Sequence, residues 1–262
     1  MDIAYYHVDS FTQKLFGGNP AGVCVLDNWL DNQTLLNIAG ENGLAETAFI
    51  IGTKGEYKIR WFTPDIEMDL CGHATLAAAF VVAEFIDHSD HVRFFSETDT
   101  IDISINNKRI NMVLPKRNPL PCDAPEILIE SVNIKPSSVL KSRDYLFIYE
   151  SEDQINNIEI NSIKFNQINL DPGGLCVTSA SKTVDFVSRY FTPQATILED
   201  PVTGSAHCSL IPYWANVLKK DTLIAKQLSH RKGDLFCENR ENDVVVSGNA
   251  VLYKKGMIYI DK

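Results

Sequence analysis

The sequence lacks the short motifs that identify most nucleotide-binding and nucleophilic enzymes. It contains no Walker-type loop, no dinucleotide fingerprint and no nucleophile-elbow motif. Its six cysteines form no CxxC pair and its six histidines are dispersed, so the spacing predicts no histidine-ligated metal site. A disulfide framework is typical of small secreted chains, whereas this chain has 262 residues. These classes of site are therefore poorly supported.

Positive charge is also scarce. The chain has 24 Lys and Arg residues against 34 Asp and Glu residues, a formal net charge of −10. This balance argues against a surface for nucleic acid or an anionic membrane, although a few local donors can still hold a small anion. The first eleven residues lack a basic region followed by an apolar one. We therefore expect no signal peptide and a reduced, cytoplasmic protein.

Residues 60–86 contain a predicted helix with no polar face. Thr75 is the one polar side chain in residues 74–83, whereas an amphipathic surface helix carries polar residues at 3.6-residue spacing. A run of this length is too short to span a bilayer. We expect a helix that protein encloses on every side, such as one inside a strongly curved sheet.

The same pattern returns later in the chain. Residues 189–193 (RYFTP) repeat residues 60–64 (RWFTP), and residues 203–206 (TGSA) take the place of residues 71–74 (CGHA). The second copy also continues into a largely apolar segment, residues 206–218. We interpret the pattern as an internal duplication of two α+β half-chains, each with short strands and a helix.

The best predicted boundary is the proline-rich segment 115–125. The N-terminal half, residues 1–115, carries Glu46 and the Gly72-His73 turn, and the last strand, residues 253–262, could complete it. The C-terminal half, residues 116–252, carries Asp200 and the Gly204-Ser205 turn. Directly after the boundary, residues 126–132 and 136–140 are predicted to be short helices.

Each duplicated turn places backbone N–H groups at a helix N-terminus, where the helix dipole favours a negative charge. If the halves pack face to face, both turns could hold one carboxylate, between Gly72 and His73 on one side and Gly204 and Ser205 on the other. The alternative is that both glycines simply make tight turns.

Three titratable residues are candidates for proton transfer. Glu46 lies among small and apolar residues, where desolvation raises a carboxyl pKa toward neutrality; it could instead be a surface glutamate at a strand edge. Asp200 lies just before the second turn and could be a second acid or base, or a turn aspartate before Pro201. His73 could relay protons, or its side chain could be satisfied by backbone.

Taken together, four segments resemble the PhzF family of phenazine biosynthesis. These are Phe16-Gly17-Gly18-Asn19-Pro20-Ala21-Gly22-Val23, Ala45-Glu46-Thr47-Ala48-Phe49, Trp61-Phe62-Thr63-Pro64 with Leu70-Cys71-Gly72-His73-Ala74-Thr75, and Glu199-Asp200-Pro201-Val202-Thr203-Gly204-Ser205-Ala206-His207. The resemblance implies a diaminopimelate-epimerase-like α+β fold. In that fold, two pseudo-symmetric halves each form a curved mixed β-sheet, barrel-like, around a central apolar helix, with the site between them.

The resemblance also implies roles for particular residues. Glu46 matches the family's catalytic glutamate, while His73 and Asp200 match its supporting histidine and aspartate. Gly72, together with Gly204 and Ser205, matches the substrate-contacting turns. The implied activity is isomerisation by proton transfer on a small carboxylate-bearing substrate, without a cofactor or metal, in a homodimer. The family's best-known member acts in this way on a dihydro-hydroxyanthranilate.

Related epimerases use two cysteines on opposite faces of the substrate. Here Cys71 stands at the first such position but Thr203 at the second, and a hydroxyl without an evident activating base is a poor proton acceptor at neutral pH. We therefore predict that Cys71 is a buried side chain and not a catalytic thiol. Two alternatives to the isomerase stay open: a racemase or epimerase of an amino-acid-like substrate that uses Glu46 with a second base, and a catalytically inactive small-molecule binding protein.

Overall fold

The computed structural model describes residues 1–170 and 173–260. Residues 261–262, the end of the last strand expected from the sequence, lie outside them. The chain divides into two compact units, Met1–Leu114 with Ser247–Lys262 and Pro115–Val246. Over the described residues, no helix is long and apolar enough to cross a membrane.

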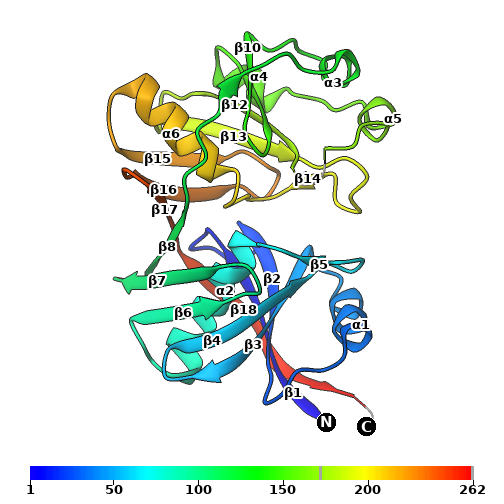
Figure 1. The fold of residues 1–262 in the computed structure, drawn as a ribbon, viewed down its shortest axis with the longest axis vertical. Helices are drawn as coiled ribbons and strands as arrows, with labels where there is room; N and C mark the ends of the chain where they lie inside the picture. The colour runs from blue at the N-terminus through cyan, green and yellow to red at the C-terminus, as the bar shows by residue number, and fades with distance from the viewer. Residues whose placement is uncertain (171–172, 261–262) are drawn as a thin grey trace. The chain divides into compact units, whose positions relative to one another are not determined.

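The first unit is a mixed sheet with two helices and one π-helical turn (Figure 1). Its elements are β1 (Asp2–Ser10), β2 (Asn19–Val25), α1 (Asn32–Asn42), β3 (Glu46–Thr53), β4 (Glu56–Phe62), β5 (Glu67–Met68), α2 (Gly72–Val81), η1 (Val82–Ile86), β6 (His91–Phe95), β7 (Thr100–Asn106), β8 (Arg109–Pro115) and β18 (Ala250–Tyr259).

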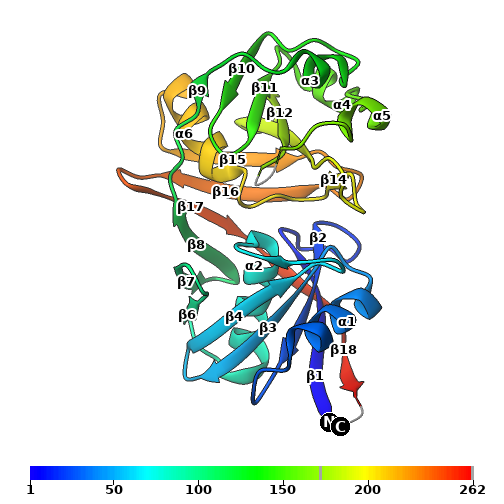
Figure 2. The same cartoon turned by 45° about the vertical axis from the view of Figure 1, so that its right-hand side comes forward.

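β1 lies in the middle of this sheet, because it pairs with β2 on one side and with the C-terminal strand β18 on the other. In both views β1 and β18 lie side by side (Figures 1 and 2). Alternate residues of β1 point to opposite faces of the sheet. Ile3 and Tyr5 join the apolar cluster under α1, while Tyr6 stacks on Phe85 at the end of the α2–η1 segment, with ring centroids 5.3 Å apart. The sheet therefore has a helix packed on each face.

The helix expected within residues 74–83 is α2, which begins two residues earlier, at Gly72. All of its residues except Phe80 are buried, and β1, β2, β3 and β18 all contact it. The absence of a polar face is thus explained by enclosure within the sheet, as the sequence predicted. A mixed sheet around a buried helix confirms the α+β class for this unit.

The second unit is again a mixed sheet with one long helix. Its elements are β9 (Leu120–Pro121), α3 (Glu126–Glu130), β10 (Ser138–Lys141), β11 (Tyr145–Ile148), α4 (Glu152–Asn156), α5 (Ser162–Phe165), β12 (Leu175–Ala180), β13 (Phe186–Phe191), β14 (Glu199–Asp200), α6 (His207–Leu218), β15 (Thr222–Gln227) and β16 (Gly233–Asn239). β17 (Asp243–Gly248) contains the point where the chain returns to the first unit.

Strand pairing repeats between the units. In the first, β2 is parallel to β3, β3 antiparallel to β4, and β4 parallel to β6. In the second, β11 is parallel to β12, β12 antiparallel to β13, and β13 parallel to β15. In each unit a largely buried helix, α2 or α6, precedes the last of these strands. The duplication predicted from the RWFTP and RYFTP segments is therefore present in the topology.

A repeated arginine–glutamate pair marks the two copies. Arg60 donates from Nε and Nη2 to the two carboxylate oxygens of Glu67, each at 2.6 Å. In the second copy, Arg189 makes the same two-pronged contact with Glu199, at 2.7 and 3.0 Å. Each pair ties a long strand to the short strand that follows it, β4 to β5 and β13 to β14. The pair therefore fixes the path of the chain into each turn.

One local prediction is wrong. The sequence analysis predicts a short helix at residues 136–140. Ser138–Lys141 instead form β10, which pairs with both β9 and β11. Pairing with strands elsewhere in the chain overrides the local preference.

Candidate active site

Glu46 is the first residue of β3. Gly43 ends α1 in the left-handed conformation, and the chain then enters β3 beside β2, with Ala21 opposite Glu46 and Gly22 opposite Thr47. A Cβ atom at Gly22 would lie 2.8 Å from Thr47 Oγ1, so glycine is required for this close approach. The Glu46 side chain keeps 17% of its surface exposed, although its Oε2 atom is buried. Glu46 is therefore partly buried beside β2, which argues against the alternative of a surface glutamate at a strand edge.

His73 is the second residue of α2 and is buried. Its Nε2 atom lies 3.2 Å from Glu46 Oε2, and its Nδ1 atom lies 3.5 Å from Cys71 Sγ. The Ser10 hydroxyl donates to the His73 carbonyl at 2.8 Å and so ties the helix start to β1. The structure thus brings together two of the predicted site residues, Glu46 and His73, and adds Cys71 on the far side of the imidazole ring.

Charge at this cluster follows from its contacts. Burial alone would lower the pKa of His73, but its buried contacts with Cys71 and with the Glu46 carboxylate raise that pKa well above 6.5. Burial and the neighbouring Glu46 raise the pKa of the Cys71 thiol, so Cys71 stays protonated at neutral pH. The cause that we assign to the charged His73 is therefore the Glu46 carboxylate. Cys71 is buried, as predicted.

Glu46, Cys71 and His73 are also the kind of donors that hold metal ions, and their donor atoms lie within 4.8 Å of one another. The dispersed histidines gave no sign of such a cluster in the sequence. An imidazole must lose the proton on the nitrogen that binds a metal, and the raised pKa of His73 makes that loss less favourable.

The two buried histidines are expected to carry opposite charge states at pH 7. Burial lowers the pKa of His207 to about 4, while that of His73 is raised. The protonated His73 stabilises the fold fully below about pH 6.5, and this contribution is lost as the pH rises through its raised pKa. His207 acts in the opposite sense, since the fold loses stability as the pH falls from about 6.5 to about 4.

Long-range ¹H–¹⁵N NMR spectra recorded from pH 4 to pH 9 would measure both charge states, with His73→Asn and His207→Asn variants to assign the signals. Two protonated ring nitrogens are expected for His73 at pH 7.5 and one for His207. A His73 that loses its second proton below pH 6.5 would contradict the assigned ion pair.

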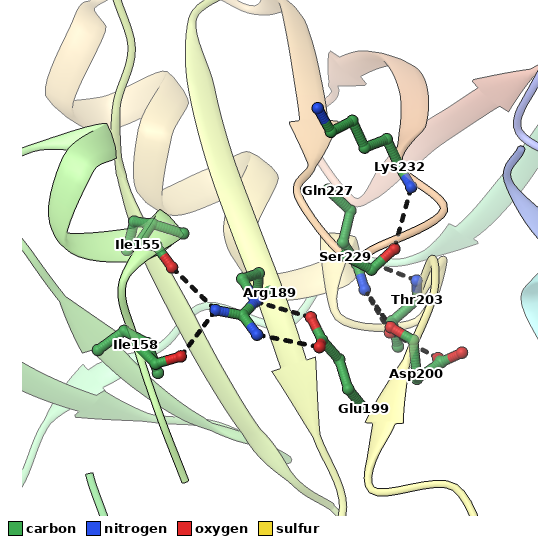
Figure 3. Close-up of polar contacts among 9 residues, drawn as sticks. All are labelled: Ile155, Ile158, Arg189, Glu199, Asp200, Thr203, Gln227, Ser229 and Lys232. Carbon is green, nitrogen blue, oxygen red and sulfur yellow. Dashed lines mark hydrogen bonds and ion pairs between the residues drawn. The ribbon is translucent and has the colours of Figure 1, made fainter. Parts of the chain in front are cut away.

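Asp200 lies in the second unit, in the short strand β14 opposite Tyr190 of β13. The Thr203 hydroxyl donates to Asp200 Oδ2 at 2.6 Å (Figure 3). The structure therefore places a carboxylate within hydrogen-bond distance of the Thr203 hydroxyl, a contact that was not evident in the sequence. Two residues separate Asp200 from Thr203, which is the spacing of a tight turn, yet the sequence alone did not reveal this contact.

Sequence reasoning also missed Gln227, the last residue of β15. Its side chain is buried and bonds both Asp200 and Thr203 (Figure 3). The separation of 24 residues from Thr203 and the lack of any motif around Gln227 explain why no local pattern identified it.

The predicted turn residues occupy the starts of the two long helices. Gly72 is the first residue of α2 and is buried. Gly204 and Ser205 precede α6 in a turn closed by hydrogen bonds from the His207 amide to the Gly204 carbonyl and from the Cys208 amide to the Ser205 carbonyl, each 3.1 Å long. His207 in turn uses its Nδ1 atom to contact the Thr203 carbonyl at 2.9 Å. Both turns therefore have the backbone geometry of a helix start.

Comparison with known proteins assigns the family. The profile of the PhzC-PhzF family, phenazine biosynthesis-like proteins, matches residues 8–256. The chain belongs to the PhzC-PhzF family. It is 43% identical to an uncharacterized isomerase of Pseudomonas aeruginosa over 99% of this chain and 100% of that protein. A crystal structure of a PhzF-family protein from Enterococcus faecalis is 39% identical, with a TM-score of 0.93 over 99% of this chain and all of that one.

More distant structures share the fold of the PhzC-PhzF chain. A probable proline racemase from Agrobacterium radiobacter superposes with a TM-score of 0.69 over 99% of this chain and 93% of that one, at 6% identity. At this identity the likeness concerns the fold alone. It confirms the epimerase-like architecture that the family resemblance implied.

The two copies within this PhzC-PhzF chain carry different chemistry at equivalent places. When Arg60 is matched with Arg189, the register of β3 against β4 corresponds to that of β12 against β13. Gly174 then stands at the position equivalent to Glu46. The pairing of β4 with β5 and of β13 with β14 makes Met68 the counterpart of Asp200. Each copy therefore contributes one carboxylate at a position where the other copy has an uncharged residue.

Proposed function

We propose that this protein is a cofactor-independent isomerase that moves a proton within a small carboxylate-bearing substrate, with Glu46 as the acid–base group. The observation that carries the proposal is the Glu46–His73 pair, in which a buried carboxylate oxygen lies 3.2 Å from a buried imidazole nitrogen. The relative from Pseudomonas aeruginosa, which is named an isomerase, supports the reaction class.

In the proposed reaction the Glu46 carboxylate removes a proton from an activated carbon of the substrate. The C–H electron pair enters the conjugated system of the substrate, and the same carboxyl group then returns the proton to a different carbon of that system. Because Oε2 faces the imidazolium of His73, proton transfer is assigned to Oε1. His73 holds the carboxyl group in position and balances its charge, and a positioned acid–base group of this kind contributes about 10²–10⁴-fold in rate.

The other predicted residues receive proposed roles in binding. The amides at Gly72, Gly204 and Ser205 lie at helix starts, where the helix dipole favours a carboxylate. Asp200 is proposed to orient the substrate through its polar groups. These roles rest on the family resemblance and on the local geometry of each unit.

A second candidate is a racemase or epimerase. The contact that favours it is the 2.6 Å hydrogen bond from Thr203 to Asp200, because this bond supplies the carboxylate that a second proton-transferring group would need. In this reaction Glu46 would remove a proton from a stereocentre. Asp200, protonated from solvent, would return a proton to the same carbon through Thr203, whose hydroxyl gives its hydrogen to the carbon and receives that of Asp200.

Solvent deuterium separates these functions. The wild-type protein is incubated in D₂O with a panel that contains dihydro-hydroxyanthranilate, L-proline and L-glutamate, and products are analysed by mass spectrometry, NMR and optical rotation. Deuterium at a new carbon, with a displaced double bond, is expected for the isomerase. Deuterium at the original stereocentre with loss of optical rotation would support the racemase instead. Tight binding of a panel member without any exchange would contradict both reactions and indicate a binding protein.

A further inference from the structure

Gln227 is buried and ends β15, far along the chain from the predicted site motifs. Its backbone belongs to the sheet, where it pairs with Ser188 and Gly233. Its side chain does not join an apolar core, since all of its polar atoms bond the segment that contains Asp200 and Thr203 (Figure 3). A buried amide with this set of partners requires an explanation beyond packing.

The three contacts of the amide determine which end is the oxygen. The Thr203 backbone N–H is a donor and lies 2.9 Å from Oε1, so that end must accept. The Asp200 carbonyl is an acceptor and lies 2.7 Å from Nε2, so that end must donate. The amide cannot be rotated by half a turn without losing both bonds.

The same amide then determines the direction of the next hydrogen bond. Nε2 also lies 3.2 Å from Thr203 Oγ1 and, as a donor, supplies a hydrogen to that oxygen. The single hydrogen of the Thr203 hydroxyl is thus left for Asp200 Oδ2, at 2.6 Å. A carboxylate is the natural acceptor for a bond of this length.

We infer that Gln227 is a positioning residue that fixes the Thr203 hydroxyl as a donor to an ionised Asp200. This inference rests on the proposed function, because it explains how the second unit would present Asp200 in one protonation state and one orientation. It also gives Thr203 a role in this chain, where the two-cysteine epimerases have a thiol. Gln227 acts through Thr203 and Asp200.

A neutron structure of the wild-type protein, exchanged into D₂O, tests the direction of these bonds without any substrate. We expect the deuterium of the Thr203 hydroxyl on the line to Asp200 Oδ2 and both amide deuteriums of Gln227 on Nε2, one of them facing the Asp200 carbonyl. A hydroxyl deuterium that points away from Asp200 would overturn the inference. This outcome does not depend on whether the proposed isomerase activity exists.

Gln227→Glu tests the functional part, because glutamate keeps an acceptor for the Thr203 amide but loses both Nε2 donors. The new carboxylate would accept the Thr203 hydroxyl hydrogen and turn it away from Asp200. With the panel member that wild type exchanges fastest, we expect about a tenfold to hundredfold loss of the deuterium exchange rate, the range for loss of a hydrogen bond to a charged group. KM should change less than threefold. Gln167→Glu, the same change at an exposed residue of this unit, should leave the rate unchanged.

Protection of the backbone amides in the β15–β16 ladder from hydrogen exchange reports whether the fold is kept in each variant. If Gln227→Glu unfolds, Gln227→Leu replaces it, and a double-mutant cycle with Thr203→Val separates positioning from general stability. If Gln227 is a positioning residue, Gln227→Leu should lower the exchange rate by less than twofold in a protein that already carries Thr203→Val. Thr203→Ser, which keeps the hydroxyl, should retain the rate that Thr203→Val loses. The inference would be overturned if the rate losses of Gln227→Leu and Thr203→Val simply added in the double variant. It would also be overturned if the exchange rate of Gln227→Glu lay within twofold of the wild-type rate. If the wild-type protein catalyses no deuterium exchange with any panel member, while the Thr203 hydroxyl deuterium still points to Asp200, only the proposed function is rejected.

Discussion

Glu46→Gln is expected to lower the rate of proton transfer by about 10²–10⁴-fold, the largest effect on activity that we predict. Glutamine has the size and shape of glutamate, but its amide cannot accept a proton from carbon at neutral pH. The side-chain oxygen can still face His73, which lies 3.2 Å from Glu46 Oε2 in the wild-type protein. The loss should therefore appear in kcat for deuterium exchange, with KM changed little.

Glu41→Gln is the matched control, because Glu41 lies in α1 of the same unit and is exposed. It should exchange deuterium at the wild-type rate. If Glu46→Gln also exchanged at that rate, Glu46 would not be the acid–base group. The binding-protein alternative would be favoured if the wild-type protein catalysed no exchange and Glu46→Gln bound a panel carboxylate as tightly as wild type does.

Gly18→Ala is expected to cause the largest loss of stability, about 3 kcal/mol in the free energy of unfolding. Gly18 has φ = +62°, a conformation that costs an alanine about 1–2 kcal/mol. In addition, a Cβ atom there would lie 2.0 Å from the Ser10 carbonyl oxygen, which is backbone and cannot easily move away. Because the Ser10 hydroxyl holds the His73 carbonyl, a shift of Ser10 would also disturb the Glu46–His73 pair.

Gly40→Ala provides a control in which the free energy of unfolding is expected to rise and not to fall. Gly40 lies within α1, is exposed, and has no heavy atom within 4 Å of where a Cβ would be placed. Alanine there should raise the free energy of unfolding by about 0.5–1 kcal/mol, since it restricts the unfolded chain and favours the helix. Urea unfolding of both variants measures the difference. Equal midpoints for Gly18→Ala and wild type would show that the segment around Gly18 can move without cost.

The buried helix and the duplication could be predicted because both depend on patterns within short segments of the sequence. An apolar run without a polar face can only be enclosed, and the repeated segments at Arg60 and Arg189 retain the same bonds, to Glu67 and to Glu199. The family resemblance named Glu46 and His73 as site residues, but their contact with each other required the structure. Cys71 was correctly expected to be buried, but its contact with His73 required the structure.

Contacts between distant segments could not be predicted. Gln227 bonds Thr203 across 24 residues of chain, and the two come together because β14 and β15 both pair with β13. The error at residues 136–140 has the same origin, because β10 owes its conformation to β9 and β11 and not to its own residues. The Thr203–Asp200 bond was missed for a different reason. A carboxylate three residues before a hydroxyl can adopt several turn geometries, and only one of them joins the two groups.

The pairing of β1 with β18 has a consequence for biosynthesis. The first unit contains both strands, and its ladder is closed by hydrogen bonds between Met1 and Ile260 in both directions. Every residue of the second unit is translated between these two strands, which takes on the order of tens of seconds at cellular rates. During that interval β1 has an unpaired edge toward the position of β18, and α2 lacks one of the strands that enclose it. The first unit therefore cannot complete its sheet until the whole second unit has been translated, and β1 keeps an open, aggregation-prone edge until β18 emerges.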